Sequence, residues 1–112
     1  MSDEPAAGAF RPPRFDVAVS DDPEGDGLLL RVSGELDIVS EPQLEAALAK
    51  AERQPIRIDL SELVFMGSTG LRTLLGAPRV YPDIVLSGPL QPAVQRLLEL
   101  TQTLAILPFK DA

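Results

Sequence analysis

The sequence contains no cysteine, no histidine and no tryptophan. The chain therefore has no thiol nucleophile, no imidazole base, no Ser-His-Asp triad and none of the usual zinc ligand sets. Serine hydroxyls are present, but no base is available to activate one, which disfavours a small hydrolase. We expect a protein that is not an enzyme and that uses neither a metal nor a cofactor.

Long apolar runs and concentrated positive charge are also missing. No run approaches the ~20 apolar residues of a membrane helix, and residues 1–8 lack the basic start and apolar stretch of a secretory signal. The formal net charge is −7 and the basic residues are scattered singly, which argues against a surface for nucleic acid. These absences predict a cytoplasmic protein that neither inserts into a membrane nor binds nucleic acid.

A chain of 112 residues predicts one domain. Residues 1–14 combine three prolines with small and charged residues and bury little, so we expect a flexible N-terminal tail before a single domain over residues 15–112. Apolar residues alternate with polar ones over 15–19 and again over 28–32, which predicts two antiparallel strands.

The remaining pattern predicts alternating helices and strands. Ser40 and Gln43 have the spacing of a capping box, so a helix should begin there and end before Pro55. Further expected elements are a strand at 56–60, a helix at 69–77 that stops at Pro78, a strand at 84–86, a helix at 89–101 and a short last strand at 104–107. With right-handed crossovers, this order predicts an α/β fold in which helices pack on one face of a mixed four- to five-stranded sheet.

Two adjacent hydroxyls, Ser68 and Thr69, lie between an expected strand and an amphipathic helix. A hydroxyl there lies at the helix N-terminus, where unpaired N–H groups and the macrodipole favour negative charge. The surface could therefore accept a phosphate, although Ser68 can also be explained as the N-cap of the helix. Thr69 is expected in the first turn, and Gly70 is expected to permit close approach to its surroundings.

The segment that carries Ser68 reads Phe65-Met66-Gly67-Ser68-Thr69-Gly70-Leu71, downstream of Gly34-Glu35-Leu36-Asp37. Over roughly residues 15–108 the chain resembles the STAS family of bacterial anti-sigma factor antagonists. In that family the segment commonly reads Phe-Met-Asp-Ser-Ser/Thr-Gly-Leu, and its first hydroxyl accepts a phosphate from a partner kinase. The resemblance implies an interaction switch that binds an anti-sigma factor or serine kinase and is controlled by phosphorylation at Ser68, less readily at Thr69.

The resemblance also implies a docking face. Because the Asp37 loop and the Ser68 loop both follow strand ends, we expect them to share a surface edge, although Asp37 and Ser40 can equally be a solvated acid and a helix cap. The implied partner-binding residues are Asp37, Ser40, Gly67, Ser68, Thr69, Gly70 and Arg72.

The sequence departs from the family pattern at Gly67, where an aspartate is usual. Either Gly67 has a positive φ that tightens the turn, which we prefer, or an acidic residue that aids kinase recognition has been lost. The family's further C-terminal helix is also expected to be missing, which would leave apolar surface open or covered by a partner. The alternative function is therefore a STAS scaffold subunit that is never phosphorylated, in a signalling assembly or on a lipid-transport ATPase.

Overall fold

The structure, a computed structural model, describes residues 14–51 and 53–110. Nearly all of the predicted tail lies outside these residues, so that boundary stays a prediction. The elements are β1 (Asp16–Asp21), β2 (Leu28–Leu36), α2 (Glu41–Lys50), β3 (Ile56–Met66), α3 (Ser68–Val80), β4 (Ile84–Ser87) and α4 (Pro92–Leu100). No helix in the described part of the chain is long and apolar enough to cross a bilayer.

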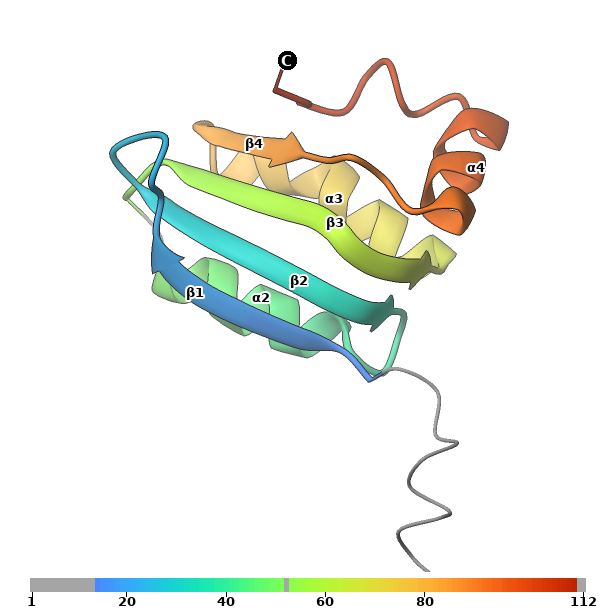
Figure 1. The fold of residues 1–112 in the computed structure, drawn as a ribbon, viewed down its shortest axis with the longest axis horizontal. Coiled ribbons are helices and arrows are strands. Elements are labelled where there is room, and N and C mark those ends of the chain that lie inside the picture. Colours follow the sequence, from blue (N-terminus) through green and yellow to red (C-terminus); the bar gives the residue numbers. More distant parts are fainter. Residues whose placement is uncertain (1–13, 52, 111–112) are drawn as a thin grey trace, which may run out of the picture.

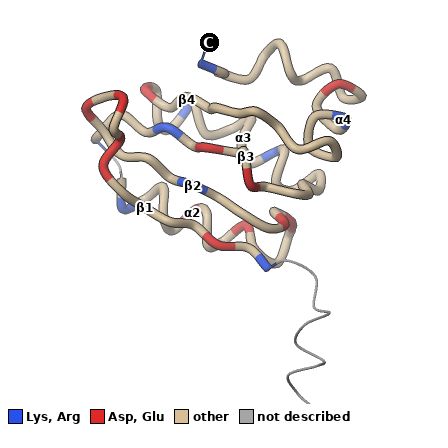
Figure 2. Tube along the Cα trace, viewed as in Figure 1, with Lys and Arg blue, Asp and Glu red and all other residues tan. Residues whose placement is uncertain are grey.

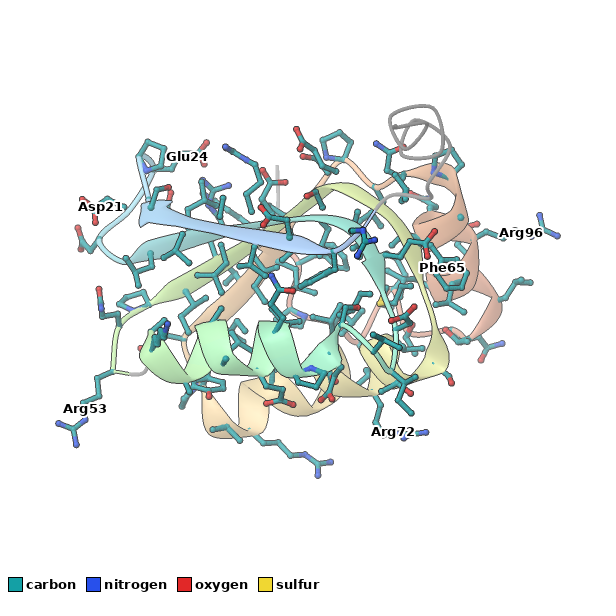
Figure 3. All side chains as sticks on the ribbon, turned by 90° about the horizontal axis from the view of Figure 1, so that it is seen from below. Asp21, Glu24, Arg53, Phe65, Arg72 and Arg96 are labelled. Carbon is teal, nitrogen blue, oxygen red and sulfur yellow. The ribbon has the colours of Figure 1, made fainter. Side chains whose placement is uncertain are left out.

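The four strands form one mixed sheet in the order β1-β2-β3-β4 (Figure 1). β1 pairs antiparallel with β2, whereas β2, β3 and β4 are parallel neighbours. Helices α2 and α3 lie on the same face of the sheet, and α4 packs near the end of β3 (Figures 1 and 3). The predicted α/β fold with helices on one face of a mixed sheet is confirmed.

One apolar core fills the space between the sheet and the helices. Its most buried side chains include Leu30, Ile58 and Leu86 from the strands and Leu48, Leu74 and Leu98 from the helices. The period of two in β3 turns Ile56, Ile58 and Leu60 into this core. Burial of these side chains by the hydrophobic effect is what holds the helices to the sheet.

On the opposite face of the sheet, Arg57 links the loop after β1 to the end of β4. Its Nη2 atom lies 2.8 Å from Asp22 Oδ1 and its Nε atom 3.0 Å from Asp22 Oδ2, while Nη1 lies 3.2 Å from Ser87 Oγ. The hydrogen bonds from Arg57 lower the pKa of Asp22 to about 2. Acidic positions gather on the β1–β2 loop at this end of the sheet (Figure 2), and Arg57 anchors that loop to the sheet.

Three sequence predictions about elements are wrong. Helix α3 does not stop at Pro78 but continues to Val80, because a proline in the last turn removes only one helical N–H and the helix still packs through its apolar stripe. Helix α4 begins at Pro92, the first-turn position where the missing N–H is harmless, and not at residue 89. Residues 104–107 form turns closed by N–H groups that bond to the Thr103 carbonyl, so the last strand is absent there, and Phe109 alone bridges to Leu86.

The strand predicted over 56–60 is also six residues too short, since β3 extends to Met66. The pairing of β2 with β3 shifts register twice, between Arg31 and Ser33 and between Gly34 and Glu35. Each shift adds a residue to β3 and interrupts its alternation, but it keeps Leu63 and Met66 buried. The longer strand carries the chain to the edge where Ser68 lies.

Two glycines of α3 should respond oppositely to alanine. A Cβ atom at Gly70 would lie 2.7 Å from Leu36 Cγ and 2.9 Å from the Leu36 carbonyl oxygen, whereas one at Gly76 would meet nothing within 4 Å. Since alanine in a helix interior is favoured over glycine by about 1 kcal/mol, Gly76→Ala should raise the free energy of unfolding by up to about that amount. Gly70→Ala should lower it. Urea unfolding of the two variants checks this, and a lowered midpoint for Gly76→Ala would contradict it.

Candidate functional site

The site lies where β2 and β3 end together. These strands are parallel, and Leu36 at the end of β2 pairs with Met66 at the end of β3. The two loops that follow therefore leave the sheet at the same edge, and the Gly67 N–H donates to the Leu36 carbonyl at 2.9 Å. The structure thus brings the Asp37 loop against the start of α3, as the sequence predicted.

The loop between β2 and α2 is closed by Asp37 and Ser40. Asp37 Oδ1 accepts hydrogen bonds from the N–H groups of Val39 and Ser40, both at 3.1 Å. The Ser40 hydroxyl donates to the Glu35 carbonyl at 2.7 Å and accepts from the Asp37 N–H at 2.9 Å. Helix α2 begins where expected, but the capping-box prediction is wrong because the Ser40 hydroxyl is used to close the loop.

Ser68 is the first residue of α3, and Gly67 holds the N-cap position. The prediction that Ser68 caps the helix is therefore wrong by one residue. The side chain is exposed, and its hydroxyl takes part in none of the side-chain hydrogen bonds found among the described residues. N–H groups in the first turn of a helix have no partner within the helix, so a phosphate on Ser68 would lie beside positive partial charge.

The preferred interpretation of Gly67 is wrong. Its φ of −88° and ψ of 179° are extended backbone that any residue adopts. A Cβ atom there would lie 3.8 Å from Phe65 Cε2 and 3.9 Å from Asp37 Cβ, which are ordinary contacts. The other interpretation, that an acidic residue which aids kinase recognition is lost at residue 67, stays a prediction.

The other predicted residues lie on the first turns of α3. The Thr73 hydroxyl lies 3.1 Å from the Thr69 carbonyl and 3.1 Å from Glu41 Oε2, so this turn is linked to α2. Gly70 lies against Leu36, as the close approach predicted for it requires. Arg72 is exposed, and its side chain points away from the body of the protein (Figure 3). The structure thus places the whole predicted set within residues 37–40 and 67–72 of one edge.

Sequence reasoning missed three apolar side chains at this edge. Ile38 and Val39 are 73% and 83% exposed in the Asp37 loop, and Phe65 is 45% exposed beside Gly67 (Figure 3). Adjacent exposed apolar side chains on a small domain make this edge a candidate interaction surface. The signal in the sequence was the adjacent pair Ile38 and Val39, two apolar residues that belong neither to the strand before them nor to the helix after them.

The backbone of Gly67 leads to a prediction about stability. Aspartate is a strong N-cap residue and alanine a poor one, so Gly67→Asp should raise the free energy of unfolding by a few tenths of a kcal/mol and Gly67→Ala should lower it. Urea unfolding in 1 M NaCl, which screens repulsion between the new carboxylate and Asp37, measures both. A loss of about 1 kcal/mol for both variants is what a positive φ would require, and it would contradict the structure.

The comparison with known proteins agrees with this geometry. A family model described as the STAS domain matches residues 15–112. The crystal structure of an anti-sigma factor antagonist from Mycobacterium paratuberculosis is similar at 30% sequence identity and a TM-score of 0.73, covering 91% of this chain and 90% of that chain. The anti-sigma factor antagonist SpoIIAA in its unphosphorylated form shares the fold at 23% identity and a TM-score of 0.64, with 88% of each chain covered. The chain belongs to the STAS domain family.

Proposed function

We propose that this STAS domain is an anti-sigma factor antagonist, a cytoplasmic interaction switch without enzymatic activity. In this proposal the unmodified domain binds a bacterial anti-sigma factor that is also a serine kinase, and phosphorylation of Ser68 ends the binding. The observation that carries the proposal is the exposed Ser68 hydroxyl at the start of α3, beside the Asp37 loop. The 30% identity to a protein described as an anti-sigma factor antagonist supports the same assignment.

The exposed apolar residues give the partner a surface to bind. Ile38, Val39 and Phe65 flank the polar residues of the edge and can be buried when a partner docks. Ser68 lies at the same edge, so a partner that covers these side chains also covers the serine hydroxyl. Modification of that hydroxyl then acts directly on the interface and needs no rearrangement of the fold.

The size of the switch follows from charge. A phosphate adds about −1.5 to −2 charges at pH 7. One pair of like unit charges about 5 Å apart, at an effective dielectric constant of about 20, costs roughly 3 kcal/mol. That energy corresponds to a loss of about a hundredfold in affinity.

The second candidate function is a STAS scaffold subunit that is never phosphorylated, in a signalling assembly or on a lipid-transport ATPase. The observation that favours it is Gly67. The backbone at residue 67 would accept an aspartate without a steric clash. The glycine therefore changes the charge of the edge and is not required by the backbone conformation. The two functions differ in whether the partner kinase modifies Ser68.

Substitutions at Ser68 test the switch. Ser68→Glu should weaken binding to the partner kinase by up to about a hundredfold, whereas Ser68→Ala should bind normally and resist switching. Ser20→Glu is the matched control, because Ser20 is exposed in β1 at the far end of the sheet. Titration calorimetry measures the affinities, and mass spectrometry after incubation with the kinase and ATP locates the phosphate.

Equal affinities for wild type and Ser68→Glu would show that the partner does not dock at this edge. Phosphate on Thr69 alone would overturn the assignment of the acceptor. Tight binding to the kinase without any phosphorylation would favour the scaffold over the switch.

A further inference from the structure

Arg72 lies one helical turn after Ser68 in α3. Residues four apart on a helix are neighbours on its surface, with Cβ atoms about 6 Å apart, and an acid at the earlier position with a base at the later one is the favourable order. Both side chains are exposed, and Arg72 belongs to none of the ion pairs found in residues 14–51 and 53–110. Phosphorylation of Ser68 would complete an acid–base pair on this face of the helix.

We propose that Arg72 pairs with the phosphate on Ser68 and holds it over the first turn of α3. This inference rests on the proposed function, since it concerns the modified form of the same serine. Arginine suits the role because its planar guanidinium donates two parallel hydrogen bonds to phosphate oxygens. The unpaired N–H groups of the first turn would add positive partial charge beside the phosphate.

Three carboxylates of neighbouring segments lie near the proposed pair. Glu41 and Glu45 of α2 line a cavity of about 330 Å³ together with Arg72, and the Asp37 loop adjoins Gly67. Glu41 accepts a hydrogen bond from Thr73, and its own hydrogen bond with Glu45 raises the pKa of Glu45. A phosphate carries more charge than any of these carboxylates and lies on the same helix as Arg72, so it competes favourably for the guanidinium.

The pairing changes the docking edge in two ways. In the unmodified protein Arg72 is available to a carboxylate of the anti-sigma factor. After phosphorylation the edge gains a dianion, and that dianion engages Arg72. Ser68→Glu carries a single charge on a differently shaped group, so it reproduces this exchange only in part.

The test uses the full chain with phosphoserine placed at position 68 by genetic code expansion, and follows the phosphate by ³¹P NMR across a pH titration. A neighbouring cation favours the dianion and lowers its second pKa. Replacing Arg72 by glutamine should therefore raise that pKa by about 0.3 units, the size expected for a helix ion pair four residues apart. Arg72→Lys should restore part of the shift, and 1 M NaCl should abolish it.

Arg79→Gln is the matched control, because Arg79 is an exposed arginine in the last turn of the same helix. Equal pKa values for Arg72→Gln and Arg79→Gln would overturn the inference. The phosphoserine is installed without a kinase and the titration needs no partner. A failure here is therefore distinct from a failure of the proposed function, which would appear as absent binding or absent phosphorylation.

Discussion

The parallel pairing of β2 with β3 is the constraint on which the candidate site depends. It aligns Leu36 with Met66, so that the chain leaves both strands at the same edge and the Asp37 loop meets the start of α3. The two register shifts are part of this alignment, because without them Leu36 would pair with Val64 and not with Met66. Gly34 lies at the second shift with a φ of 89°, and a Cβ atom there would collide with the Arg14 carbonyl oxygen at 1.6 Å. Only glycine fits that position.

Local pattern was enough to predict most of the fold. The alternation of the strands, the expected helix beginning at Ser40 and the proline at 55 that follows it predicted the first half of the element order, and the full order predicted the face on which the helices pack. The register shifts were not predictable, because a shift is a relation between two strands and its sequence signal is only a broken alternation. The hydrogen bond from the Ser40 hydroxyl was not predicted for a similar reason. Its partner, the Glu35 carbonyl, belongs to the preceding strand and not to the helix that Ser40 begins.

The sequence predicted where the candidate site lies, but it did not predict all of the side chains exposed there or the conformation of Gly67. Motif spacing placed Ser68 and Asp37 at one edge, because parallel strands end on the same side of a sheet. The conformation of Gly67 could not be read from its identity, since glycine is permitted in extended as well as left-handed backbone. The exposure of Ile38 and Val39 depends on how Asp37 and Ser40 fold the loop, which only the structure shows. The result is one edge that carries both the exposed apolar side chains of Ile38, Val39 and Phe65 and the exposed Ser68 hydroxyl.

Amide hydrogen exchange of the chain, alone and in complex with an anti-sigma factor, is the most direct test of where the partner docks. We expect added protection in residues 37–40 and 67–72, because the Asp37 loop and the start of α3 lie at the proposed docking edge. We expect no added protection in residues 22–27, which lie at the opposite end of the sheet beside Arg57. Protection confined to residues 22–27, with no change in residues 67–72, would contradict this expectation.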